Sequence, residues 1–356
     1  MKRILGGMLL LTFVAAMVIF GGCDSPNSPE SQPQPYHLAA TYSFSAAAKH
    51  VVASGDLAAV AVGAYGGVVL NVRDLAHIDT VARFPGTSAF TVMNRAMLDT
   101  LNHLVAFASN PVVGGVGSNP AYDYLHHSYV AEALPSSISF GAFLATGIVS
   151  QRNNVLFLGG EGRGTSGGSF VGYRMQRDSD TSQWVPTGSA DFTYGIPTTS
   201  FGSTNAPQGV DRRATDGISA LATEEAGVIF LDSVGTQMSA LPFAGAAYDC
   251  KWYRDSLLIV AGDFEMVVMN ARDAAHPETI GRLTIPTSDR MRGVAIDGGY
   301  ACVMDGYDGI YVVDITNPRT PAYVQLMKLD SPTSVWADAG RIYTTEQVGR
   351  LSVFTR

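Results

Sequence analysis

The sequence predicts an all-β protein that folds as a β-propeller, a ring of small antiparallel sheets called blades. After residue 36, short apolar segments are separated by Gly, Asp and Asn, and no segment keeps a helical period. Residues 63–84 repeat in residues 262–283, with seven identities within 71–83. A unit of about 40 residues with several strands is typical of a blade. Successive apolar strands end 38, 44 and 41 residues apart, at Asp232, Asn270, Asp314 and Thr355.

The first 22 residues have the pattern of a secretory signal peptide. Lys2 and Arg3 precede an apolar run over residues 4–20, which is short for a membrane-spanning helix of about 20 residues. The segment Phe20-Gly21-Gly22-Cys23 resembles the lipoprotein box of bacterial lipoproteins. The resemblance implies cleavage before Cys23 and attachment of lipid chains to this residue, which would hold the protein on a membrane without crossing it. An uncleaved anchor, or an ordinary signal peptide with a chance Cys, is the alternative.

Residues 23–37 are expected to form a tether. Residues 25–35 read SPNSPESQPQP and offer almost no apolar side chain to a core. Such Pro-rich segments favour an extended, semi-rigid geometry. The predicted organisation is therefore a signal peptide over 1–22, a tether over 23–37 and a propeller domain over 38–356.

Seven four-stranded blades fit the propeller domain, with six or eight as alternatives. The last unit has room for three strands only, over residues 334–338, 341–346 and 351–356. Residues 38–44 form an unassigned apolar strand before the first unit, and we expect it to complete the last blade and close the ring. The first strands of the blades are expected to begin near His50, Phe90, Gly147, Asp216, Asp249, Gly293 and Ser334.

One repeat unit has a recognisable sequence. Residues 310–314 read IYVVD and are followed by Asn317 and Pro318. This segment resembles the LVIVD repeat of bacterial β-propeller proteins, an aliphatic run that ends in Asp before a turn with Asn-Pro or Asp-Pro. The likeness is partial around Asn71, Asp232 and Asn270. The resemblance implies the fold and specifies no activity.

Acidic residues gather in the predicted turns between the second and third strands of the units. If these turns share one face, that face could attract a cation or a basic partner, whereas a solvated acidic rim would only keep the protein soluble. Residues 305–309 contain two carboxylates and two glycines of a calcium-loop fragment, but they lack the closing Glu and are better explained as a tight turn. The candidate residues of this face are Glu225, Asp263, Asp305, Asp308 and Glu346.

Two long loops are the expected partner-contacting surface: residues 110–129, which contain His126 and His127, and residues 159–168. The His residues are not spaced as a metal site, and His77 and His276 occupy equivalent positions that suggest a role in a turn. Cys250 and Cys302 lie in apolar strands, where they either form a disulfide or act as small hydrophobic residues.

No catalytic residue, metal ligand or cofactor motif is identified in the sequence. An isoelectric point near 5.3 and the lack of clustered Lys and Arg argue against a nucleic-acid partner. We therefore expect a lipid-anchored, extracytoplasmic binding or scaffolding module, periplasmic or at the cell surface, whose partner is a protein or glycan of the bacterial cell envelope. The alternative is a propeller hydrolase or lyase that uses acidic and His loop residues, with or without a divalent cation.

Overall fold

The computed structural model describes residues 35–84, 91–111, 121–125, 128–130, 143–151, 154–162, 168–180, 184–186, 192–196, 207–224, 226–286 and 290–356. Over these ranges the chain forms strands and no helix, so the predicted all-β class is confirmed. No helix that could span a membrane occurs in this part of the chain. The compact unit begins at Tyr36, two residues before the predicted start of the propeller domain. Cys23 and most of the predicted tether lie outside the described residues.

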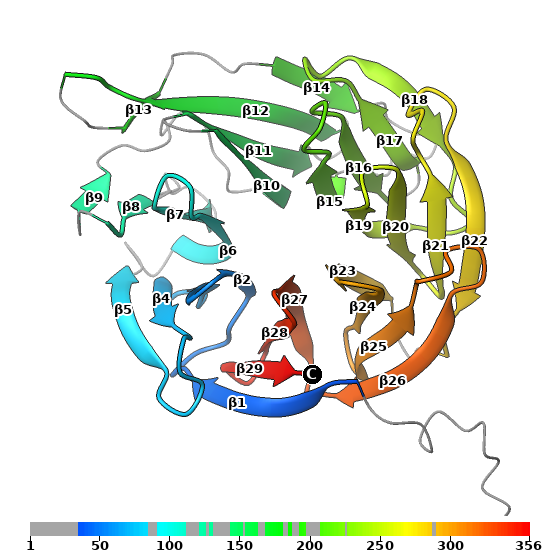
Figure 1. The fold of residues 1–356 in the computed structure, drawn as a ribbon. Helices are drawn as coiled ribbons and strands as arrows, with labels where there is room; N and C mark the ends of the chain where they lie inside the picture. The colour runs from blue at the N-terminus through cyan, green and yellow to red at the C-terminus, as the bar shows by residue number, and fades with distance from the viewer. Residues whose placement is uncertain are drawn as a thin grey trace, which may run out of the picture. The chain divides into compact units, whose positions relative to one another are not determined.

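The described strands form seven antiparallel sheets, in which the first three strands follow one another in chain order from the first strand outward (Figure 1). Sheet 1 contains β2 (His50–Ser54), β3 (Leu57–Ala61), β4 (Gly67–Asn71) and β5 (Asp79–Phe84). Sheet 2 contains β6 (Thr91–Asp99), β7 (Leu104–Pro111), β8 (Ala121–Asp123) and β9 (Ser128–Val130). Sheet 3 contains β10 (Phe143–Gln151), β11 (Asn154–Gly162), β12 (Gly168–Arg177), β13 (Trp184–Pro186) and β14 (Phe192–Ile196).

The later sheets repeat this order more regularly. Sheet 4 contains β15 (Pro207–Arg212), β16 (Ser219–Thr223), β17 (Gly227–Leu231) and β18 (Gln237–Leu241). Sheet 5 contains β19 (Ala247–Tyr253), β20 (Leu257–Gly262), β21 (Glu265–Asn270) and β22 (Glu278–Thr284). Sheet 6 contains β23 (Met291–Asp297), β24 (Tyr300–Asp305), β25 (Gly309–Asp314) and β26 (Ala322–Lys328). Sheet 7 contains β27 (Pro332–Asp338), β28 (Arg341–Glu346), β29 (Arg350–Thr355) and β1 (His37–Ser43).

The first strands of the sheets lie nearest the centre and contact one another in chain order, and β27 of sheet 7 contacts β2 of sheet 1. Sheet 7 takes strands from both ends of the chain, because β1 pairs antiparallel with β29, from His37 opposite Thr355 to Ser43 opposite Arg350. The strand over residues 38–44 therefore lies where the sequence predicts it, beside the last strand of the chain.

The core lies between the faces of neighbouring sheets. One cluster joins sheets 4 and 5 through residues such as Phe230, Leu258 and Val267, and another joins sheets 1 and 7 through Val60, Leu70 and Tyr343. Strands buried on both faces need nearly continuous apolar sequence, which explains why the third strands of the later sheets read VIFL, VVM and IYVV. The predicted strands that close on Asp232, Asn270, Asp314 and Thr355 are these third strands, and the first of them ends one residue earlier, at Leu231.

The prediction of a first strand near Asp216 is wrong. The first strand of sheet 4 is β15, which ends at Arg212, and Asp216 lies in the following turn. There its carboxylate accepts hydrogen bonds from Arg213 and from the backbone N–H of Ile218. Sheet 3 also differs from a simple four-stranded unit, because β13 and β14 both pair with β12, at opposite ends of that long strand. Phe90 lies outside the described residues.

The repeated segments 63–84 and 262–283 form the same turn after the third strands of sheets 1 and 5. Asp74 accepts the backbone N–H of Ala76, and its second oxygen lies 3.1 Å from Nδ1 of His77. Asp273 makes the equivalent contacts, with 2.9 Å to His276. The expected role of these His residues in a turn is confirmed. Cys250 and Cys302 are free and buried in different sheets, so they act as small hydrophobic residues.

Candidate functional site

The acidic candidates occupy the turns between second and third strands. Asp263 and Asp308 lie in these turns, and Asp305 and Glu346 end the strands that lead into them. Antiparallel pairing places the start of each first strand beside the same turn, as Pro332 opposite Glu346 shows in sheet 7. We call this side of the sheets, where the second-to-third-strand turns and the first-strand starts lie, the turn face. Glu225, His126 and His127 lie outside the described residues.

Each described candidate is engaged within its own sheet. Asp263 accepts hydrogen bonds from the backbone N–H of Ala246 and from the Tyr248 hydroxyl, both at 3.0 Å. Burial, together with this hydrogen bond, raises the pKa of Tyr248 to about 12. Asp305 is fully buried and accepts the N–H groups of Tyr307 and Asp308, which is the tight turn expected for residues 305–309.

Glu346 is enclosed as completely as Asp305. It is fully buried, and its carboxylate accepts two hydrogen bonds from the Arg350 guanidinium, one of 2.7 Å from Ser352 Oγ and one of 3.1 Å from the backbone N–H of Asp330. Burial alone would raise the pKa of Glu346, but these hydrogen bonds outweigh it and lower the pKa. The carboxylate therefore fixes the turn of sheet 7 and does not point to an open site.

The acidic candidates do not converge on one centre. In the ranges that the structure describes, no group of three or more His, Cys, Asp or Glu side chains could hold a metal ion. A catalytic centre of the hydrolase alternative would require such groups within hydrogen-bond reach of one another or of one metal.

The same turns expose large apolar side chains at equivalent positions. Tyr65, Phe264, Tyr307 and Val348 are 57–66% exposed and lie between the second and third strands of sheets 1, 5, 6 and 7. These four sheets follow one another in space, because the first strands of sheets 5, 6, 7 and 1 are in successive contact. We call these four side chains the apolar arc. The arc gives no recognisable motif in the sequence, because each of its four residues lies in a different turn.

A hollow of about 460 Å³ lies beside the arc, between sheets 7 and 1. Tyr42, Phe44, Tyr65 and Arg83 contribute to its walls. Phe44 follows β1 and donates its backbone N–H to the carbonyl of Gly349, next to Val348. The hollow therefore opens on the turn face between two members of the arc.

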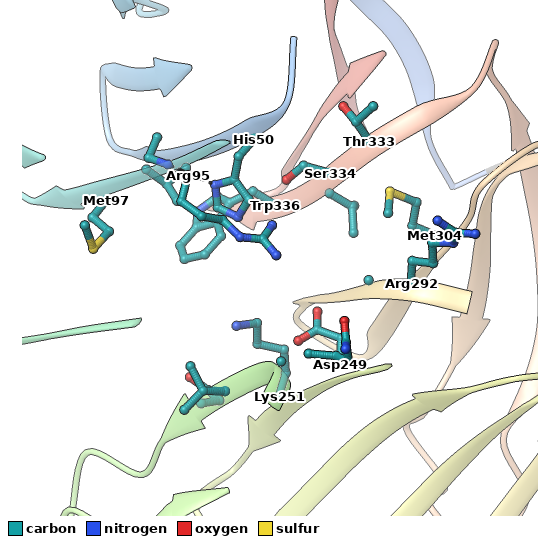
Figure 2. Close-up of a pocket in the computed structure, with 18 of the residues that line it drawn as sticks. His50, Arg95, Met97, Asp249, Lys251, Arg292, Met304, Thr333, Ser334 and Trp336 are labelled. Carbon is teal, nitrogen blue, oxygen red and sulfur yellow. Dashed lines mark hydrogen bonds between the residues drawn. The ribbon is translucent and has the colours of Figure 1, made fainter. Parts of the chain in front are cut away.

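A second cavity of about 140 Å³ lies among the first strands (Figure 2). Its walls come from β2, β6, β15, β19, β23 and β27, with Met304 added by β24. Several of these strands carry a β-bulge one or two residues after they begin, and the residues that follow the bulge turn toward the cavity. The polar side chains in the wall are His50, Arg95, Gln208, Asp211, Asp249, Lys251, Arg292, Thr333 and Ser334.

Polar groups in this wall join four of the described first strands to the next sheet. Asp211 accepts the N–H of Trp252 at 2.8 Å, and Asp249 accepts that of Val294 at 2.9 Å. His50 Nδ1 accepts the N–H of Ala96 at 3.4 Å, and Ser334 Oγ that of Val51 at 3.3 Å. Side chains that line the cavity thus also hold neighbouring sheets together.

The enclosed setting shifts the protonation of these groups. Burial raises the pKa of Asp249, although Lys251, backbone hydrogen bonds and Arg95 oppose the shift. Burial lowers the pKa of His50 well below its usual value, and Arg95 and Lys251 add to this effect, so the ring is neutral. Burial acts against the charge of Lys251, but Asp211 and Asp249 more than offset it and raise the pKa of the ammonium.

The sequence contains a signal for this cavity, but the signal can be interpreted only when the pairing and order of the strands are known. In β19, Asp249 and Lys251 alternate with the buried Cys250 and the core residue Trp252. Alternation of this kind places the two charges on one face of the strand. Without the neighbouring first strands, the pattern does not distinguish a central cavity from an exposed edge.

Comparison with known proteins supports the fold. The LVIVD repeat family matches residues 290–327, which span sheet 6 and include the segment that resembles this repeat. The crystal structure of the computationally designed Ika8 protein is similar with a TM-score of 0.58 and 11% identity, over 91% of this chain and 100% of that chain. A chain in the crystal structure of the Mitotic Checkpoint Complex is similar with a TM-score of 0.63 and 10% identity, over 94% of this chain and 96% of that chain. No curated protein matches the sequence. These similarities indicate a repeat protein of the β-propeller type.

Proposed function

We propose that this protein is a lipid-anchored, extracytoplasmic, seven-bladed β-propeller that binds or scaffolds a protein or glycan of the bacterial cell envelope. The apolar arc is the observation that carries the proposal. Large apolar side chains exposed at equivalent turns of four successive sheets form a broad binding surface, whereas single exposed residues elsewhere need no explanation. The hollow between sheets 7 and 1 adds a recess in which a partner side chain or sugar could be anchored.

A closed ring of seven blades is part of the proposal. It is supported by seven sheets in the described ranges, by the contact of β27 with β2, and by the pairing of β1 with β29. A rigid ring would hold the four turns of the arc in fixed positions and so lower the entropic cost of binding. The hydrolase or lyase alternative is less well supported, because the described acidic candidates are bonded within their own sheets.

Replacing the arc is expected to weaken partner binding at least about tenfold, because exposed aromatic residues are frequent hot spots of interfaces. The variant carries Tyr65→Ser, Phe264→Ser, Tyr307→Ser and Val348→Ser in the lipid-anchored chain. A photo-crosslinking residue at position 307 identifies the partner in intact envelopes, and binding to the purified partner is then measured for each variant.

The matched control replaces Leu101, Leu125 and Val234 with Ser; these side chains are 54–67% exposed in turns on the opposite side of sheets 2 and 4. We expect the control to bind like the wild type, and both variants to keep its melting temperature, since all the replaced side chains are exposed. Equal binding by the arc variant, or loss of binding in the control alone, would show that the partner does not use the arc.

The Cys23→Ser variant tests the anchor. It is expected to lose incorporation of a radiolabelled fatty acid and to leave the membrane fraction, because lipid chains are the proposed attachment. Cys250→Ser serves as the control, since Cys250 is a buried free thiol in β19, and it should keep both the label and the membrane attachment. Unchanged sedimentation of Cys23→Ser with membranes would instead assign attachment to the apolar run over residues 4–20.

A further inference from the structure

The cavity among the first strands offers a second kind of binding site, distinct from the apolar arc. Its volume of about 140 Å³ is close to that of an engineered protein cavity of about 150 Å³ that binds benzene. One part of the wall is apolar, with Val52, Met97, Val210 and Trp336. The remaining wall carries the charged side chains already described.

Two cations reach into this cavity. Figure 2 shows Arg95 of β6 and Lys251 of β19 extending toward its interior from opposite sides. The Lys251 ammonium lies 5.6 Å from the centre of the Trp336 ring, across the cavity. Within the described ranges it has neither a hydrogen bond nor an ion pair, so its donors face the cavity. Lys251 is half-buried, and a ligand in the cavity could supply acceptors to its ammonium.

The carboxylates of the wall are engaged elsewhere. Asp249 accepts the N–H groups of Cys250 and Val294 with its two oxygens, and Asp211 accepts that of Trp252. Asp249 also packs closely against β15, where a Cβ at position 209 would collide with it, so Gly209 is required there. These contacts commit the carboxylates to joining sheets and leave hydrogen-bond donors facing the space.

Cations outnumber carboxylates among the described residues of the wall. Arg95, Lys251 and Arg292 are positive, whereas Asp211 and Asp249 are the described carboxylates. His50 adds no charge, because its Nδ1 accepts the Ala96 N–H and burial keeps the ring neutral. The described part of the wall therefore favours an anionic group over a cationic one.

We propose that the central cavity binds a small monocarboxylate, with its carboxylate between Arg95 and Lys251 and its apolar part against Met97, Val210 and Trp336. A carboxylate placed between them can accept charge-assisted hydrogen bonds from both side chains. The apolar wall then favours a short aliphatic or aromatic group over a second charge. A cavity of this volume has room for a group about as large as a benzene ring with one carboxylate.

Isothermal titration calorimetry of the full-length protein with benzoate and butyrate tests this assignment. Benzamide and butyramide serve as neutral probes of nearly the same shape, and inorganic phosphate as an anion without an apolar part. We expect saturable binding of a carboxylate and at least about tenfold weaker binding of the matching amide. The fluorescence of Trp336 should respond to the carboxylate, and Trp336→Phe should remove that response.

Lys251→Met is expected to weaken carboxylate binding at least about tenfold, since it removes one of the two charges that face the ligand. Lys49→Met is the matched control, because the Lys49 ammonium donates to the Gln347 side chain and Lys49 is not among the described residues that line the cavity; this variant should bind like the wild type. Absence of saturable carboxylate binding to the wild type, equal binding of carboxylate and amide, or tighter binding of phosphate would each overturn the assignment. The comparison of carboxylate, amide and phosphate uses the wild type alone, so it tests the assignment even if Lys251→Met does not fold.

Discussion

A chain that lacks residues 24–45 is expected to melt at least about 10 °C below the full-length protein, because sheet 7 loses the strand that joins the two ends of the chain. Without β1, the edge of β29 would present unpaired backbone groups along its length. The deletion also removes Ala40, Tyr42 and Phe44, which pack against the cluster between sheets 1 and 7. Circular dichroism and differential scanning calorimetry measure the loss.

Tyr36 adds to this effect, since it lies just before β1 and is almost fully buried. Its hydroxyl donates a hydrogen bond of 2.6 Å to Asp297 of sheet 6. Its backbone N–H and carbonyl are both bonded to the Gln325 side chain of β26. The segment therefore joins sheet 7 to sheet 6 as well as to sheet 1, and several buried groups lose their partners when it is removed.

The control for this deletion removes residues 24–34 only, upstream of the compact unit that begins at Tyr36. We expect that variant to melt within about 2 °C of the full-length protein, because the buried contacts of Tyr36 and β1 are kept. A shorter chain without residues 24–45 that melted at the same temperature would show that the pairing of β1 with β29 does not stabilise the protein.

The sequence was sufficient for the features that repeat along the chain. Third strands such as β25 are buried on both faces, so their apolar runs and closing Asp314 stand out and set the period. First strands are harder to recognise, because one face lines the cavity and carries polar residues. In sheet 4 the first strand reads PQGVDR and lacks an apolar run, which is why the sequence predicts this strand near Asp216 instead. The pairing of both β13 and β14 with β12 in sheet 3 could not be predicted from the repeat, because the regular units have no such arrangement.

The candidate site was predictable in position but not in role. Turn sequences place Asp263, Asp305, Asp308 and Glu346 on one side of the sheets, and that placement agrees with the structure. Whether a carboxylate faces solvent or its own turn depends on the backbone conformation, which the sequence alone does not specify. The central cavity depends on bulges and on side chains from strands far apart in the sequence, so it becomes visible only when all the sheets are assembled.

Glu346→Gln is expected to destabilise the protein by about 3 kcal/mol at pH 7, because it removes the charge of a buried carboxylate that Arg350, Ser352 and the Asp330 N–H all contact. Urea denaturation at several pH values measures the difference in unfolding free energy between the wild type and the variant. Glu265→Gln is the control, because the Glu265–Arg282 pair lies at the surface, and we expect a loss below about 1 kcal/mol.

The pH dependence separates the charge of Glu346 from the shape of its side chain. Folding lowers the pKa of this group, so its ionised form stabilises the native state at pH values above the unfolded pKa of about 4.3. This contribution is lost as the pH falls through the lower pKa of the folded state, where the wild-type carboxylate also becomes protonated. The difference between wild type and Glu346→Gln should therefore be full near neutral pH and shrink in acid. A difference that stays constant down to the acid range would mean that packing, and not the ionised carboxylate, holds this turn.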